Sequence, residues 1–340
     1  MSAPFQPRYQ ILRTFLFALL LALFGFLGFR SYQHMGSTSS DSTSVYSAPD
    51  SNFTHVWTAP SDWRMMYLQS EEKELVVYGR ELIAHTSDYL GPKGSVKAIS
   101  NGMNCQNCHL EAGTKPWGLN YGSVFSTYPK FRERSGSIET IYKRINDCME
   151  RSLNGKALDT NSKEIKAIYA YIRWLGEAVP KGKKVRGSGI ELIPQLNVAA
   201  NPKNGLYVYT QYCQKCHGNN GEGLMNKEGN MYEYPPLWGA HSYNDAAGIN
   251  QLSKLAGFIK NNMPNPVNYH NPTLTTQQAW DVAAYISSHS RPTKDKSKDW
   301  PVLATKPFDY PFGPYADTFS VTQHKYGPFE PIQLAKLAKK

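Results

Sequence analysis

Apolar residues recur at helical spacing in two segments that lie in opposite halves of the chain. Residues 161–174 and 275–286 both place apolar side chains three and four positions apart, and both carry Ala-Tyr-Ile near their ends. Ser162 stands where the first of these helices needs an N-terminal cap. The repeat predicts two helical modules with one layout, each closed by a C-terminal helix.

Three further segments have helical periodicity. Residues 75–82 predict one helix, and residues 248–262 predict another, with Leu252, Leu255 and Ile259 on its apolar face. In residues 137–152 the buried face would consist of Ile138, Ile141, Ile145 and Cys148. We therefore expect Cys148 to end the apolar face of a helix.

The N-terminus has a different pattern. Residues 15–29 are continuously apolar and follow Arg8 and Arg13, which is typical of a signal-peptide core or a short membrane anchor. Either would export the rest of the chain, so we expect a periplasmic protein, soluble after cleavage or tethered to the inner membrane through residues 11–29. A serine-rich stretch at 36–52 reads as a tether.

Composition narrows the class of protein. The 340 residues, 41% hydrophobic and 19% charged, suit two globular domains. The formal net charge is +10, from 37 basic and 27 acidic residues, yet the basic residues form no compact block that would follow a phosphate backbone. Nucleic acid is thus disfavoured as a partner, whereas small anions fit the charge.

Four of the five cysteines fall into two copies of one motif. Cys105 and Cys108 precede His109, and Cys213 and Cys216 precede His217, so both stretches read C-x-x-C-H. This is the pattern of covalent c-type haem attachment, in which two thiols bond the porphyrin and the histidine lies under the iron. A redox C-x-x-C or a zinc knuckle is the rival reading, but the redox motif does not call for the histidine.

The motifs and helices together predict an all-α fold with two cytochrome c-like domains, each around a covalently attached haem. The expected boundaries are a signal or anchor helix at 1–30, a tether at 31–59, a first domain at 60–185, a linker at 186–200, a second domain at 201–290 and a Pro-, aromatic- and Lys-rich tail at 291–340. The tail's Pro-aromatic pieces suggest packing against the domains rather than disorder.

A second axial ligand sets what each iron does. Met263 follows the predicted helix at 248–262 and precedes Pro264, which is where a cytochrome c places its thioether ligand. Met225 and Met231 lie close to His217, and we expect them to be core residues. His217 and Met263 are therefore the predicted axial ligands of the second iron.

The first module offers the fifth cysteine instead of a methionine loop. Cys148 lies 39 residues after His109; its neighbour Met149 competes for the iron but points about 100° away on a helix. An inert core thiol is the alternative. Arg144 and Ser152, four residues before and after Cys148, would share its helix face, and a nearby arginine lowers a thiol pKa and binds oxyanions.

These residues resemble the di-haem thiosulfate dehydrogenases, a family of tetrathionate-forming cytochromes c. The stretches that carry the resemblance are 105–113 (CQNCHLEAG), 145–158 (INDCMERSLNGKAL), 235–239 (PPLWG), 256–264 (AGFIKNNMP) and 299–315. The stretch around Cys148 is the specific one, because C-x-x-C-H alone occurs in many unrelated cytochromes.

The resemblance implies roles for individual residues. It implies that His109 and Cys148 ligate an active-site iron, that His217 and Met263 ligate an electron-exit iron, and that Arg134, Arg144 and Ser152 hold the substrate. Some members have lysine where this chain has Asn262, so a ligand exchange at that position is not expected here.

The implied reaction couples two thiosulfate ions to tetrathionate and passes two electrons to a small soluble c-type cytochrome or a similar acceptor. In this family the ligand cysteine is thought to leave the iron and carry a sulfane sulfur covalently. Two alternatives stay open, a tetrathionate reductase that runs the reaction in reverse and a di-haem electron carrier without catalysis. Cys148 with Arg134 and Arg144 disfavours the carrier, which needs no thiolate ligand beside anion-binding arginines.

Overall fold

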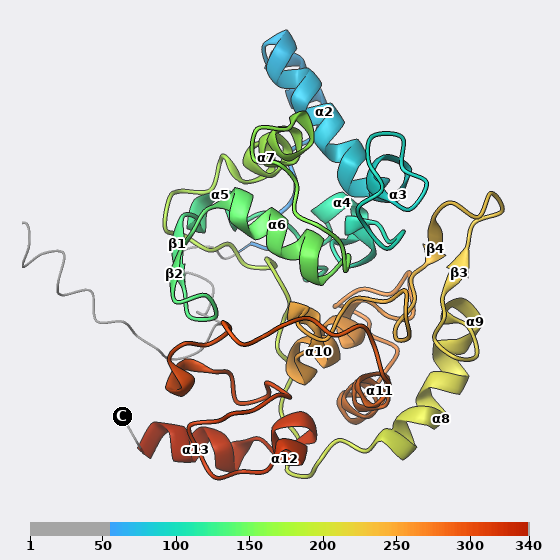
Figure 1. Ribbon diagram of the computed structural model, residues 1–340, viewed down its shortest axis with the longest axis vertical. Coiled ribbons are helices and arrows are strands. Elements are labelled where there is room, and N and C mark those ends of the chain that lie inside the picture. Colours follow the sequence, from blue (N-terminus) through green and yellow to red (C-terminus); the bar gives the residue numbers. More distant parts are fainter. Residues whose placement is uncertain (1–54, 339–340) are drawn as a thin grey trace, which may run out of the picture. The chain divides into compact units, whose positions relative to one another are not determined.

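The computed structural model describes residues 55–338, which are mostly helical (Figure 1). The predicted signal or anchor helix at 1–30 and most of the tether lie outside the described residues. No helix within residues 55–338 has both the length and the apolar character to cross a membrane. Both predicted cytochrome modules lie in one compact unit, Ala48–Lys340.

The first module carries two 3-10 helices, six α-helices and a small hairpin. In chain order the elements are η1 (Asp62–Tyr67), α2 (Ser70–Ala84), α3 (Thr86–Leu90), η2 (Cys105–Asn107), α4 (Leu110–Gly113), α5 (Val124–Thr127), β1 (Lys130–Arg132), β2 (Ser137–Glu139), α6 (Ile141–Arg151) and α7 (Lys163–Gly176).

The second module and the tail follow. Their elements are α8 (Pro202–Tyr212), α9 (Gln214–His217), β3 (Leu224–Met225), β4 (Tyr232–Tyr234), η3 (Gly248–Asn250), α10 (Leu252–Asn262), α11 (Thr276–Ser288), η4 (Leu303–Thr305), α12 (Val321–Tyr326) and α13 (Glu330–Ala338).

Both modules cross their first and last helices in the same way. Helix α2 packs on α7, and α8 packs on α11 (Figure 1). A glycine permits each close crossing: a β carbon at Gly79 would lie 2.0 Å from the Ala167 carbonyl oxygen, and one at Gly205 would lie 2.0 Å from that of Asp281. The repeated layout predicted from the two Ala-Tyr-Ile segments is confirmed.

The helices expected at 161–174 and 275–286 begin within two residues of their predicted starts. The Ser162 hydroxyl accepts from the Ile165 N–H at 3.3 Å and caps α7, and Thr275 caps α11 by accepting from the Gln278 N–H at 3.1 Å. The segment predicted as helix 248–262 is the short η3 followed by α10, and α2 includes the predicted residues 75–82.

One predicted helix begins later than its periodicity suggests. Residues 137–139 form β2, which pairs antiparallel with β1, so Ile138 is 72% exposed instead of lying on a buried helix face. Gly136 has φ 61°, a value that glycine adopts readily, and it turns the chain between the two strands. The Thr140 hydroxyl then caps α6 by accepting from the Lys143 N–H at 3.2 Å. The start of this helix was therefore predicted wrongly.

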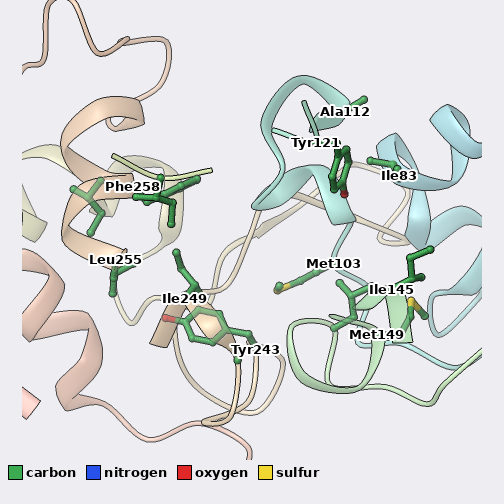
Figure 2. Close-up of a cluster of buried hydrophobic side chains, with 14 of the residues drawn as sticks. Ile83, Met103, Ala112, Tyr121, Ile145, Met149, Tyr243, Ile249, Leu255 and Phe258 are labelled. Atoms are coloured by element: carbon green, nitrogen blue, oxygen red, sulfur yellow. The ribbon is translucent and has the colours of Figure 1, made fainter. Parts of the chain in front are cut away.

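The buried apolar residues of both modules form one cluster. Figure 2 shows part of it, with Met103, Tyr121 and Ile145 from the first module and Tyr243 and Phe258 from the second. The tail adds to the same cluster through Phe329 and Ile332, which confirms that it packs against the modules. The two modules thus share a core, and side chains from both can meet at one site.

Candidate functional site

The first C-x-x-C-H motif lies on η2 and the start of α4. The Asn104 side chain accepts from the Asn107 N–H, and the Asn107 side chain accepts from the Asn104 N–H, so the two residues cap η2. The Cys105 N–H donates to the Thr86 hydroxyl at 2.9 Å. The His109 Nδ1 lies 2.5 Å from the Leu119 carbonyl oxygen, and its ring stacks on Tyr121 with centroids 4.5 Å apart. This bond engages Nδ1 and leaves Nε2 as the atom that can ligate a metal.

Cys148 lies against His109, although 39 residues separate them in the chain. Burial pushes the pKa of the Cys148 thiol up, but the Arg144 guanidinium and a hydrogen bond with the His109 side chain outweigh it, and the pKa falls to about 7. The structure therefore brings together the two side chains that the sequence predicts as axial ligands of the first iron.

The four thiols of the two motifs suit covalent haem attachment. Burial raises the pKa of Cys105 to about 11, that of Cys108 to about 12 and that of Cys213 to about 12, so these thiols stay protonated. All five cysteines are free and half-buried. Because the His109 and Cys148 side chains meet beside Cys105 and Cys108, this donor set fits a c-type haem with two protein ligands on its iron.

The second motif lies where α8 meets α9. His217 is buried, its Nδ1 lies 2.9 Å from the Pro235 carbonyl oxygen, and burial lowers its pKa, which favours the neutral imidazole that binds iron. Met263 is half-buried at the end of α10. Met225 is 38% exposed on β3, so its predicted place in the core is wrong. Ligation of the second iron by His217 and Met263 stays a prediction.

The predicted substrate residues surround the start and end of α6. Arg144 lies one turn before Cys148, and the Cys148 charge is the largest cause that raises the pKa of Arg144. Arg134 is 7% exposed and forms an ion pair with Asp147 at 3.2 Å. Ser152 ends the helix, where its N–H donates to the Cys148 carbonyl oxygen at 2.8 Å. Both arginines and the thiol therefore lie close together.

Other cations lie beside Arg134 and Arg144. Lys130 on β1 and Lys254 on α10 interact electrostatically with both Arg132 and Arg144, and Arg132 lies 3.8 Å from Glu139. Sequence reasoning missed these residues. The alternation Lys-Phe-Arg-Glu-Arg at 130–134 could have shown that the strand places its cations on one face, but nothing in the sequence pairs the hairpin with Lys254.

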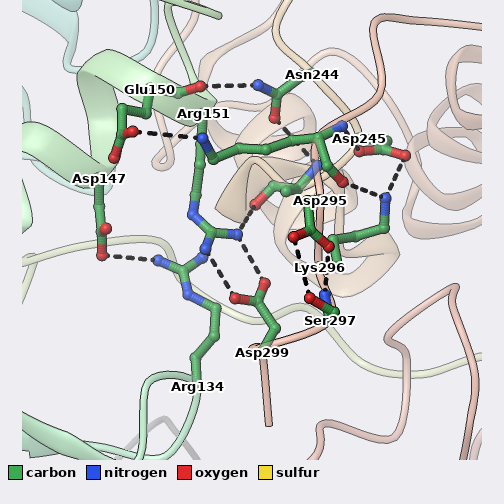
Figure 3. Close-up of polar contacts among 12 residues, drawn as sticks. Arg134, Asp147, Glu150, Arg151, Asn244, Asp245, Asp295, Lys296, Ser297 and Asp299 are labelled. Carbon is green, nitrogen blue, oxygen red and sulfur yellow. Dashed lines mark hydrogen bonds and ion pairs between the residues drawn. The ribbon is translucent and has the colours of Figure 1, made fainter. Parts of the chain in front are cut away.

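A polar network holds the end of α6 against the second module and the tail (Figure 3). The Arg151 guanidinium donates two hydrogen bonds to Asp299, at 2.7 and 2.8 Å. The Asn244 amide donates to the Glu150 carbonyl oxygen at 2.8 Å, and the Trp300 N–H donates to the Arg134 carbonyl oxygen at 2.8 Å. The tail thus fixes two arginine-bearing segments of the first module.

Comparison with known proteins matches both modules to cytochrome c domains. Residues 95–180 match the family described as SoxA/TsdA, cytochrome c domain, and residues 202–290 match the family described as Cytochrome c. With its two C-x-x-C-H motifs, this pair of domains implies two c-type haems.

Three relatives extend the match. A thiosulfate dehydrogenase of Psychrobacter arcticus is 40% identical over 60% of this chain and 61% of its own length. One of Allochromatium vinosum is 36% identical over 64% of this chain and 79% of its own. The solved structure of the thiosulfate dehydrogenase TsdBA of Marichromatium purpuratum superposes with a TM-score of 0.64 at 31% identity, over 70% of this chain and 50% of that one.

The predicted family is thus confirmed by relatives of similar sequence and by a solved structure of similar fold. The chain spans less than two thirds of the Psychrobacter relative and half of the Marichromatium chain, whereas it spans most of the Allochromatium one. On the strength of that last match and of the fold, this chain belongs to the thiosulfate dehydrogenase family.

Proposed function

We propose that this protein oxidises two thiosulfate ions to tetrathionate and passes the two electrons to a small c-type cytochrome or a similar acceptor. The observation that carries the proposal is the position of Cys148 beside His109, the predicted iron ligand, and beside Arg144. An electron carrier needs the histidine, but it needs no thiolate ligand beside anion-binding arginines. The relatives that match this chain are themselves named thiosulfate dehydrogenases.

The described residues would hold two haems. Cys105 and Cys108 would bond the first and Cys213 and Cys216 the second, with His109 and Cys148 as axial ligands of the first iron and His217 and Met263 of the second. When bound, the two haems supply two one-electron acceptor sites, which together match the two electrons of the reaction. Every other requirement of the reaction falls on side chains of the protein.

The arginines meet the electrostatic requirement. Two thiosulfate dianions repel each other, and guanidinium groups remain charged at any working pH. We assign Arg134 and Arg144 the task of binding the sulfonate oxygens in forked hydrogen bonds, with Ser152 as a further donor at the end of α6. Asp147 holds Arg134 in place through the 3.2 Å ion pair, so the guanidinium is positioned before substrate arrives.

Cys148 meets the requirement for an electrophilic sulfur. In the first step the thiolate and the sulfane sulfur of one thiosulfate form a disulfide bond, Cys–S–S–SO₃⁻, and two electrons leave. In the second step the other thiosulfate attacks that sulfane sulfur, which releases tetrathionate and regenerates the thiolate. The low pKa of about 7 that Arg144 and His109 give Cys148 makes the thiolate a good leaving group.

The test replaces Cys148 in the haem-loaded protein. Cys148→Ser and Cys148→Gly are expected to abolish thiosulfate-dependent reduction of a c-type cytochrome and formation of tetrathionate. Met149→Leu on the same helix is the matched control, because it changes a buried side chain that helical geometry points about 100° from that of Cys148. Full activity in either Cys148 variant, at normal haem content, would overturn the proposal.

We also propose a periplasmic location, since c-type haem is attached outside the cytoplasm and residues 1–30 have the pattern of an export signal or anchor. Cell fractionation of the full chain tests it: the haem-stained protein is expected in the periplasmic or inner-membrane fraction. Recovery of the haem-loaded protein in the cytoplasm would contradict the location without touching the proposed reaction.

A further inference from the structure

Lys254 is a cation of the second module that lies beside the arginines of the first. It stands in the first turn of α10 and is half-buried. Its ammonium group donates to the side-chain oxygen of Gln251, one turn earlier. A lysine in such a place is unusual, because an ammonium group out of water needs neighbours that offset its charge.

The tail fixes this end of α10. Asp309 accepts from the Gln251 amide at 3.1 Å and from the N–H and hydroxyl of Ser253 at 3.0 and 2.5 Å, so three donors share its carboxylate. It is 2% exposed. Asp309 therefore acts mainly as the cap of α10, and it fixes the helix turn that carries Lys254.

Contacts along the tail connect this point to the arginine site. Tyr310 follows Asp309 directly, and its ring lies 5.8 Å from that of Trp300. The Trp300 N–H in turn donates to the Arg134 carbonyl oxygen at 2.8 Å. Hydrogen bonds and ring packing through Asp309, Tyr310 and Trp300 thus connect the start of α10 to the backbone of Arg134.

The surroundings of Lys254 are strongly cationic. Burial and the charges of Arg132, Arg134 and Arg144 lower its pKa to about 7, against the opposing effect of Asp309. Four cations from two modules therefore converge on one place, and Asp147 and Glu139 are already engaged with Arg134 and Arg132. Such a gathering of cations is stabilised when an anion joins it.

We propose that Lys254 binds a sulfur oxyanion together with Arg134 and Arg144, so that the anion site is complete only when both modules contribute. This inference rests on the proposed function and extends it, because two thiosulfate dianions need more positive charge than one pair of arginines supplies. It also gives α10 a role at both ends, with Lys254 at the anion site and Met263 at the predicted ligand position of the second haem.

The experiment measures binding without turnover. The haem-loaded protein, reduced with titanium(III) citrate and desalted under nitrogen, has no acceptor for electrons, and thiosulfate is titrated into it by calorimetry. Lys254→Gln is expected to raise the dissociation constant about tenfold, the effect of losing one charge-assisted hydrogen bond. Lys254→Arg keeps the charge and is expected to stay within about threefold of the original protein.

Lys227→Gln is the matched control, since it removes one exposed lysine of the same module, and haem spectra and melting temperatures check that each variant folds. A Lys254→Gln protein that binds thiosulfate as tightly as the original would overturn the inference, as would a lack of thiosulfate binding by the original protein. If the original protein binds thiosulfate but forms no tetrathionate, the proposed function is wrong, and the comparison at Lys254 still decides the inference.

Discussion

At the scale of single residues, Arg144 carries the strongest link between the fold and the chemistry. It lies one turn before Cys148 on α6, and the thiolate charge of Cys148 is the main cause that raises its pKa. Arg144→Ala is expected to raise the Michaelis constant for thiosulfate at least tenfold, because the substrate loses a forked, charge-assisted partner. Steady-state kinetics with cytochrome c as acceptor measure it.

The matched control for Arg144→Ala is Arg173→Ala. Arg173 lies on α7 and is 43% exposed, with ion pairs to Glu72 and Glu177, so its loss changes the net charge equally and leaves the site intact. Haem spectra of both variants are expected to match those of the original protein. An unchanged Michaelis constant in Arg144→Ala would place the anion site elsewhere.

Lys254 makes the affinity for thiosulfate depend on pH. Burial and the charges of Arg132, Arg134 and Arg144 lower its pKa to about 7, although Asp309 opposes them. The side chain is therefore charged below pH 7 and neutral well above it. The Michaelis constant is therefore expected to rise about tenfold between pH 6 and pH 9. In Lys254→Arg the guanidinium stays charged, so the profile is expected to flatten. Because Cys148 is present in both proteins, the difference between the two profiles reports Lys254 alone.

At the scale of elements, α6 depends on an ion pair with the tail. Arg151 and Asp299, 13% and 7% exposed, form two hydrogen bonds (Figure 3). Asp299→Asn leaves a buried guanidinium without its counter-charge and is expected to lower the free energy of unfolding by about 3 kcal/mol. Guanidinium denaturation followed by circular dichroism measures the change.

The exposed pair Arg173–Glu177 on α7 is the control for this prediction. Glu177→Gln breaks an i,i+4 ion pair at the surface and is expected to cost less than about 0.5 kcal/mol. Equal losses in the two variants would show that burial of the Arg151–Asp299 pair adds nothing to its effect on stability.

Periodic elements could be predicted from the sequence, and short ones could not. Helices α7 and α11 have regular apolar faces and side-chain caps, so residue patterns alone locate them. The hairpin of β1 and β2 has three residues per strand and exposes Phe131 and Ile138, which leaves no apolar alternation to find. Ile138 belongs to β2, which ends at Glu139, and α6 begins at Ile141. Its agreement with the helical spacing of α6 is therefore a coincidence of position.

In the candidate site, too, local patterns identified some residues and missed others. Motif spacing identified both attachment sites, and helical spacing put Arg144 and Ser152 on either side of Cys148. The position of Lys254 beside them could not be predicted, because it depends on how the tail holds α10. Contacts between segments more than a hundred residues apart leave no local pattern in the sequence.

At the scale of the whole molecule, the loop beside the first haem motif is bonded to the segment that carries Met263. Residues 115–119 include Leu119, whose carbonyl oxygen contacts the His109 ring. From the same loop the Lys115 ammonium donates to the Val267 carbonyl oxygen at 3.1 Å, and the Trp117 carbonyl oxygen accepts from the Asn262 amide at 3.2 Å. Through these bonds the first module holds residues on both sides of Met263, namely Asn262 and Val267. Met263 is the predicted ligand of the second iron.

Lys115 is 8% exposed, so its bond to Val267 lies away from water and is hard to replace. Lys115→Met keeps the length of the side chain and removes the donor, and it is expected to loosen the loop that carries Met263. Two measurements check this. The near-infrared band of methionine-ligated haem is expected to weaken, and the midpoint potential of the second haem is expected to fall as the thioether is lost.

Lys181→Met is the control, because Lys181 also donates to a carbonyl oxygen, that of Phe125, within the first module. An unchanged band and potential in Lys115→Met would mean that the second module positions Met263 by itself.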